Sequence, residues 1–257
     1  MPVLAAGPQA GEGINMPRPK NPTSRVLLTF SSRPGRLRSL LLHPLGGGLG
    51  PFTGLVPPLA RQGPVHGLRA AGLTDREEPD HTIEAMLRRY STALRQLSVA
   101  PNLLVGYSLG GLLAWELAVV LAREGPPPRV VLIDSSPDPW QLSEAAEADL
   151  RSAVLGQAVA DRDDLTALRR TVDAHIAARR GYRVTNRYLG PTLLIPCTAI
   201  DGTAQSESWS ALADNLTVQP IRCGHFDVFN RENLPIVLQL VRTFLKSDHA
   251  MSPTCNP

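Results

Sequence analysis

Residues 103–118 read LLVGYSLGGLLAWELA, and this stretch decides the fold. A short apolar run is followed by the pentapeptide G-Y-S-L-G and then by a second apolar run with helix-like composition. Strand, tight turn with serine, and helix in this order form the arrangement called a nucleophile elbow. Glycines flank the serine because a β-carbon at either position would collide with the neighbouring strand or helix. The stretch therefore predicts that Ser108 lies exposed at a turn.

The pentapeptide alone is weak support for a nucleophilic serine, because a chain of this length contains G-x-S-x-G by chance roughly one time in ten. A serine hydroxyl is also a poor nucleophile near neutral pH. It needs a histidine to take its proton and a carboxylate to orient that histidine. The prediction therefore depends on whether the rest of the chain supplies both groups.

Composition indicates one soluble globular domain, expected over residues 26–247. The chain has 257 residues, of which 43% are hydrophobic and 19% charged, enough to bury a sizeable core. The net charge of +3 is small and the arginines are scattered, which argues against nucleic-acid binding. Three cysteines without a C-x-x-C pair argue against a disulfide framework and a metal site, and they fit a reducing cytoplasm.

The two ends of the chain, residues 1–25 and 248–257, are expected to be flexible tails. The first 20 residues have no basic segment followed by an apolar core, so they do not read as a secretory signal. Nor does any apolar stretch approach membrane-spanning length. We expect a cytoplasmic monomer with no membrane contact.

Strands and helices alternate along much of the chain. Buried strands are expected at residues 40–43, 65–68, 103–105, 129–134, 192–196 and 216–221, and helices at 81–99, from 112, and at 233–246. Asp80 or Thr82 could cap the helix at 81–99. Apolar strands alternating with helices predict a mostly parallel sheet covered on both faces, with catalytic groups at the carboxyl ends of strands.

Residues 138–190 break this alternation with a charged, helix-forming stretch. A helical insertion over the working edge of the sheet would be a lid. The alternative is an ordinary pair of surface helices.

Among the six histidines, His225 alone lies after a late strand and before the final helix, so it is the predicted general base. His43 ends a strand beside a glycine-rich loop, where contact with substrate is an alternative to a structural role.

Two residues are candidates for the carboxylate that orients the histidine. Asp134 follows a buried strand, where a lone carboxylate is costly unless paired, whereas Asp201 lies in a turn where an exposed aspartate costs nothing. This favours Asp134 and leaves Asp201 open.

An oxyanion hole needs two backbone N–H groups. Leu109, directly after the serine, would supply one, and Leu45 in the loop H-P-L-G-G would supply the other, since Pro44 has no N–H to donate.

Five segments occur in an order that resembles the thioesterase domains that close nonribosomal peptide and polyketide synthases. They are residues 42–47 (LHPLGG), 65–73 (VHGLRAAGL), 106–111 (GYSLGG), 132–135 (LIDS) and 224–226 (GHF), and the resemblance extends over about residues 26–245. It implies an α/β-hydrolase fold in which Ser108 accepts an acyl or peptidyl chain from the phosphopantetheine of a carrier protein. Hydrolysis or cyclisation would then release the chain, without a cofactor or metal. In chain-terminating members the aspartate stands where Asp134 does, whereas discrete editing thioesterases place it nearer Asp201.

The chain departs from that pattern in two ways. It begins with a short Pro-rich segment rather than a carrier domain, and it has no G-G-D-S attachment site, so the carrier is expected on another chain or in a longer parent. The segment expected to be the lid, residues 138–190, shows no clear similarity to the lid of any known member, so the identity of the substrate is not predicted. The alternatives are a discrete editing thioesterase, a general serine esterase, and a non-catalytic binding protein on a hydrolase fold.

Overall fold

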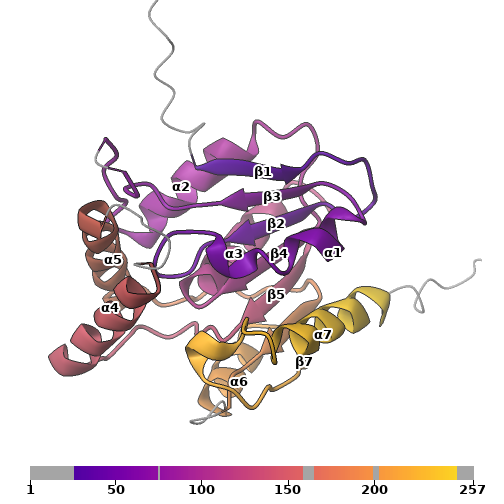
Figure 1. Cartoon of the computed structure of the whole chain (residues 1–257). Helices are drawn as coiled ribbons and strands as arrows, with labels where there is room; N and C mark the ends of the chain where they lie inside the picture. The colour runs from indigo at the N-terminus through magenta and orange to yellow at the C-terminus, as the bar shows by residue number, and fades with distance from the viewer. Residues whose placement is uncertain (1–25, 75, 159–164, 199–202, 248–257) are drawn as a thin grey trace, which may run out of the picture.

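The computed structural model describes residues 26–74, 76–158, 165–198 and 203–247 (Figure 1). The predicted tails lie outside these ranges. Within them, a seven-stranded sheet has the order β1-β3-β2-β4-β5-β6-β7, and every neighbouring pair is parallel except β1 and β3. The strands are β1 Leu27–Ser31, β2 Ser39–Leu42, β3 Val65–Leu68, β4 Leu103–Tyr107, β5 Arg129–Ile133, β6 Thr192–Ile195 and β7 Leu216–Val218. The predicted fold class, a mostly parallel α/β sheet, is confirmed.

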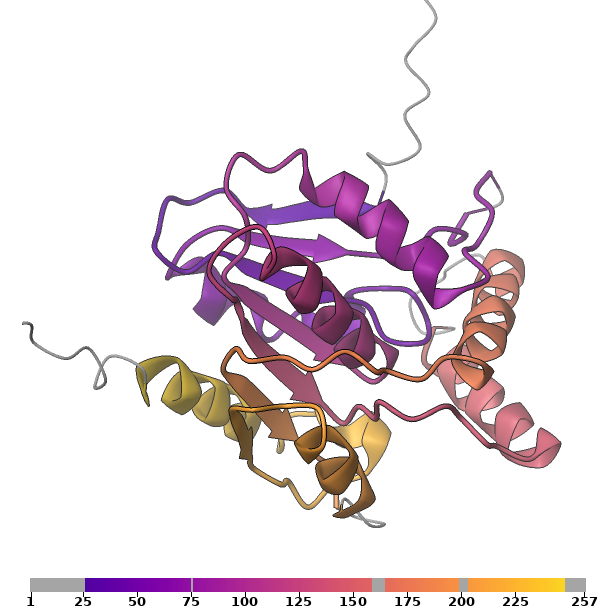
Figure 2. The ribbon, with the colours of Figure 1, turned by 180° about the vertical axis from the view of Figure 1, so that it is seen from behind.

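Helices cover both faces of this sheet (Figures 1 and 2). The helices in the described ranges are η2 Gly50–Phe52, α1 Val56–Ala60, α2 Ile83–Leu94, α3 Leu109–Leu121, α4 Glu144–Ala158, α5 Leu165–Arg180, α6 Thr203–Ser210, η4 His225–Asp227 and α7 Leu234–Ser247. Successive side chains of β4 alternate between the two faces, as the pleat of a strand requires. Leu104 belongs to the core under α2 and α3, whereas Leu103 and Val105 belong to the core under α1 and α7.

Several predicted boundaries differ from those in the structure. The helix predicted at 81–99 ends at Leu94, and Thr82 rather than Asp80 caps it, with the Thr82 hydroxyl accepting from the Ala85 amide at 3.1 Å. Asp80 instead pairs with Arg89 at 2.7 Å. The last strand ends at Val218, and Ile221 forms only an isolated bridge.

Strand β1 and helices α1 and α6 were not predicted. β1 is an edge strand in which Leu28 and Phe30 are exposed, although residues 26–30 (VLLTF) are mostly apolar. α1 is a five-residue helix with two prolines, which fit its first turn because the first N–H groups of a helix have no partner within it.

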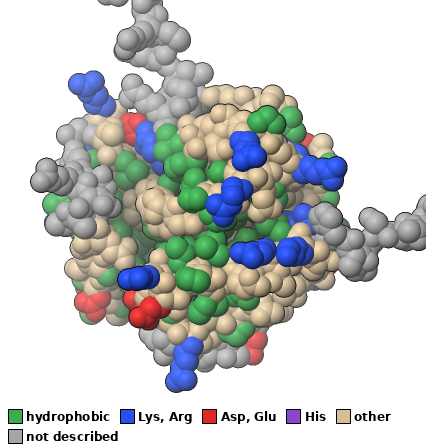
Figure 3. Space-filling view, turned by 45° about the vertical axis from the view of Figure 1, so that its right-hand side comes forward, with side chains coloured by type: hydrophobic (Ala, Val, Ile, Leu, Met, Phe, Trp, Pro, Cys, Tyr) green, Lys and Arg blue, Asp and Glu red, His purple; other side chains and the backbone are tan. Residues whose placement is uncertain are grey.

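Helices α4 and α5 fill much of the segment predicted as a lid. They pack against each other and lie at one end of the sheet (Figure 1). No helix in the described ranges is both long and apolar enough to cross a lipid bilayer. On the face seen in Figure 3, Lys and Arg side chains lie in several separate places among apolar and polar ones.

Candidate active site

Ser108 occupies the turn between β4 and α3 in a conformation that L-residues rarely adopt. Its φ is 57° and its ψ is −122°. Two hydrogen bonds hold the turn: the Ser108 N–H donates to Ile133 O at 2.9 Å, and the Gly111 N–H donates to Ser108 O at 3.1 Å. A strained residue persists only where its surroundings over-determine it. The fold therefore holds this serine in one conformation at the carboxyl end of β4. The prediction that Ser108 is exposed was wrong, because the residue is only 9% exposed.

The flanking glycines let α3 approach the sheet at backbone-to-backbone distance. A β-carbon on Gly106 would lie 2.0 Å from Gly110 O, and one on Gly110 would lie 2.1 Å from Leu42 O. Both distances are far inside van der Waals contact. The steric reason predicted for these glycines is confirmed.

Asp134 and His225 are in direct contact. Asp134 directly follows β5 and also has a positive φ, 42°. Its Oδ2 lies 2.5 Å from His225 Nδ1. An ionised carboxylate can only accept, so Nδ1 carries the proton, and in the neutral imidazole Nε2 keeps a free lone pair. The histidine is therefore oriented to accept a proton at Nε2.

The Asp134 carboxylate is stabilised in its ionised form. Its other oxygen, Oδ1, accepts from the Cys197 amide at 3.0 Å and from Gln205 Nε2 at 3.1 Å. Burial raises the pKa of Asp134, but the hydrogen bonds from His225, Cys197 and Gln205 outweigh it, so the pKa lies below its ordinary value. Sequence reasoning missed Gln205, because no motif marks a residue on α6 that faces this carboxylate.

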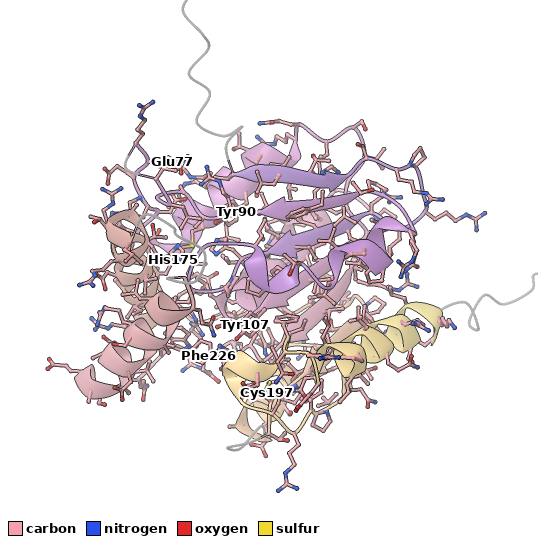
Figure 4. The ribbon with its side chains drawn as sticks, in the orientation of Figure 1. Glu77, Tyr90, Tyr107, His175, Cys197 and Phe226 are labelled. Carbon is pink, nitrogen blue, oxygen red and sulfur yellow. The ribbon has the colours of Figure 1, made fainter. Side chains whose placement is uncertain are left out.

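Tyr107 holds the segment that carries His225. Its ring stacks on the His225 imidazole, with centroids 4.9 Å apart, and its hydroxyl donates to the His225 backbone oxygen at 2.7 Å. In Figure 4, Tyr107, the last residue of β4, and Phe226 lie at the end of the sheet beside which α4 is drawn. Tyr107 is thus a further site residue that sequence reasoning missed, although it lies within the G-x-S-x-G motif.

A pocket of about 400 Å³ opens beside these residues. Ser108 and His225 both line it, together with the loop after β2 and apolar side chains of α4 and α5, among them Leu150, Val154 and Leu168. Among the described residues no hydrogen bond joins the Ser108 and His225 side chains. Catalytic hydrogen bonds are often long without substrate and tighten when it binds.

The predicted oxyanion donors are the backbone N–H groups of Leu45 and Leu109. Leu109 is the first residue of α3, and Leu45 lies in the loop after β2 and lines the pocket. Neither amide donates a hydrogen bond within the part of the chain that the structure describes. Their role as oxyanion donors stays a prediction.

Two open questions from the sequence have different outcomes. His43 is fully buried and does not line the pocket, which favours its structural role over contact with substrate. Asp201, the alternative acid, lies outside the described residues.

No group of three His, Cys, Asp or Glu side chains that could hold a metal ion occurs within the described ranges.

Comparison with known proteins identifies relatives for most of the chain. The family model described as "Thioesterase domain" matches residues 40–245. Malpinin synthetase of Mortierella alpina is 25% identical over 242 residues, and AMB antimetabolite synthetase AmbE of Pseudomonas aeruginosa is 30% identical over 231. The matches cover 87% and 79% of this chain but only 3% and 11% of those synthetases. The solved structure of RedJ, 25% identical, aligns with a TM-score of 0.70 over 83% of this chain and 95% of RedJ.

Proposed function

This chain belongs to the thioesterase domain family, a hydrolase family, and from that premise we propose that Ser108 takes an acyl or peptidyl chain from a carrier-bound thioester. The chain so transferred is released by hydrolysis or cyclisation, in the biosynthesis of a nonribosomal peptide or polyketide. The support for a carrier as partner is that several matched relatives are nonribosomal peptide synthetases, of which the matches cover 12% or less.

In the proposed reaction His225 Nε2 removes the proton of the Ser108 hydroxyl as Oγ attacks the thioester carbonyl. Asp134 stabilises the imidazolium that forms. The amides of Leu45 and Leu109 donate to the oxyanion of the tetrahedral intermediate. When the intermediate collapses, the carbon–sulfur bond breaks and His225 returns the proton to the departing thiolate, leaving an ester on Ser108.

In the second half of the reaction, His225 removes a proton from the nucleophile that attacks this ester. Water gives the free acid, and a hydroxyl or amine of the chain itself gives a ring. The same histidine then returns the proton to Ser108 Oγ, which restores the enzyme.

One observation carries the proposal: His225 Nδ1 lies 2.5 Å from the Asp134 carboxylate, and the same imidazole lines a pocket with Ser108. A serine, a histidine that can accept its proton and an aspartate that orients the histidine are the groups that this type of acyl transfer uses. No metal or cofactor is part of the proposed reaction.

The function is tested by release of free thiol from S-octanoyl-N-acetylcysteamine. We expect steady release by the wild-type chain and loss of it in Ser108→Ala. Wild-type rates in Ser108→Ala would overturn the proposal.

Carrier dependence is tested by comparing octanoyl-CoA with an octanoyl-loaded peptidyl carrier domain at equal concentration. A higher kcat/KM for the loaded carrier is expected, and equal values would instead favour an editing thioesterase or a general esterase.

A further inference from the structure

His43 is a buried imidazole beside the loop that carries the proposed oxyanion donor Leu45. It is fully buried, and it stacks on His175 of α5 with ring centroids 5.2 Å apart and planes 18° from parallel. Tyr90 of α2, also fully buried, contacts it in a T-shaped arrangement with ring centroids 5.7 Å apart (Figure 4 labels Tyr90 and His175). The proposed reaction uses none of these three side chains directly, so their arrangement calls for another explanation.

The contacts of His43 define its tautomer. Nδ1 lies 2.8 Å from Pro44 O, and a carbonyl oxygen can only accept, so Nδ1 carries a proton. Burial, together with the neighbouring His175, lowers the pKa of His43 to about 3, so the ring is neutral. Nε2 therefore has a lone pair, which accepts the Tyr90 hydroxyl at 2.5 Å. Tyr90 thereby keeps the proton of His43 on the nitrogen that faces Pro44 O.

The hydrogen bond to Pro44 O determines where the Leu45 N–H points, because both belong to one peptide unit. In a trans peptide the C=O and the following N–H point in opposite directions. Pro44 O accepts from His43 Nδ1 and also from the Gly47 N–H at 2.9 Å. The Leu45 N–H consequently points away from both donors, and it donates to nothing within the described residues.

A second imidazole fixes the next peptide unit of the loop. His175 Nδ1 donates to Leu45 O at 2.7 Å, and the pKa of His175 is lowered to about 4, chiefly by burial. Successive peptide planes on either side of the Leu45 α-carbon are thus each held by one buried, neutral histidine. Such a loop needs no rearrangement when charge develops in the transition state, which is what makes an oxyanion donor effective.

We propose that His43, locked by Tyr90, is a positioning residue that aims the Leu45 N–H into the oxyanion hole. This inference rests on the proposed function, because it assigns the Leu45 amide to the transition state of acyl transfer. It predicts an effect on kcat rather than on KM, since the oxyanion exists only in the transition state.

Two substitutions at His43 separate positioning from packing. His43→Asn keeps an N–H donor near the position of Nδ1, whereas His43→Gln moves its amide to the position of Nε2 and leaves Pro44 O without that donor. We expect kcat for octanoyl-N-acetylcysteamine to fall about tenfold to a hundredfold in His43→Gln, with KM within about twofold. His43→Asn should recover most of the loss, although both variants lose the imidazole stack.

Equal losses of kcat in both variants, or a wild-type kcat in His43→Gln, would overturn the inference. If His43→Gln does not fold, Tyr90→Phe replaces it, because that change removes only the hydroxyl that locks the tautomer. It should lower kcat at unchanged KM, and a wild-type kcat there would equally overturn the inference. Ser108→Ala measured in parallel separates the two proposals: its activity decides the proposed function, and the His43 variants decide the role of His43.

Discussion

Asp134 Oδ2 lies 2.5 Å from His225 Nδ1, although 91 positions separate the two residues in the chain. The sheet explains the contact. β5 pairs with β6 and β6 with β7, all in parallel, so the segments after these strands emerge at one edge. Asp134 follows β5, and the loop after β7 leads to His225. The acid and the histidine therefore meet because parallel strands present their carboxyl ends together.

The contact predicts different effects for the two candidate acids. Asp134→Asn removes the charge that orients His225 and stabilises its imidazolium, so single-turnover deacylation should slow by about 10³- to 10⁴-fold. Asp201→Asn serves as the matched control and should stay within a few-fold of wild type. A larger loss at Asp201 than at Asp134 would reverse the assignment of the acid.

Gly110 should tolerate no side chain. Its β-carbon would lie 2.1 Å from Leu42 O and 2.7 Å from His43 O, both backbone atoms that cannot rotate away. We expect Gly110→Ala to lower the free energy of unfolding by about 3 kcal/mol or more, the upper end of overpacking. Gly125→Ala is the control, because a β-carbon there meets no atom within 4 Å. Urea unfolding measures both, and similar midpoints for the two variants would contradict the close packing of α3 on β2.

The buried histidines should make the fold sensitive to mild acid. Burial lowers the pKa of His43 to about 3 and that of His175 to about 4, from 6.5 for an exposed histidine. As pH falls below 6.5, the unfolded chain binds protons that the folded chain does not, so stability falls. Between pH 7.5 and pH 5 each histidine should cost about 2 kcal/mol.

Urea unfolding of wild type and His43→Gln at both pH values tests this dependence. The variant has lost one of the two histidines, so its stability should fall by about 2 kcal/mol less between the two pH values. An equal fall in both proteins would mean that His43 does not titrate as described.

Much of the sheet could be predicted because its central strands are buried on both faces. β2, β4 and β5 read as unbroken apolar runs, and the glycines around Ser108 have a steric requirement that a sequence displays directly. β1 was missed although residues 26–30 (VLLTF) are mostly apolar, because this antiparallel edge strand lies outside the alternation of parallel strands and helices from which the other strands were predicted. Elements whose position depends mainly on tertiary contacts have only a weak pattern in the local sequence.

The residues of the site could largely be named from the sequence, whereas the contacts between their side chains could not. His225 follows from its place between a late strand and the last helix. The residues favoured Asp134 as the acid but left Asp201 open, because both follow predicted strands that neighbour each other in the chain. The roles of Tyr107 and Gln205 depend on which atoms face His225 and Asp134, and that information exists only in three dimensions.

The central claim, that Ser108 is the nucleophile, is tested most directly by covalent labelling with a fluorophosphonate probe. Intact-protein mass spectrometry should show one adduct on the wild-type chain, and peptide mapping should locate it at Ser108. Ser108→Ala should show no adduct while keeping the circular-dichroism spectrum and urea midpoint of the wild type. Labelling retained in Ser108→Ala, or an adduct mapped to another residue, would contradict the account.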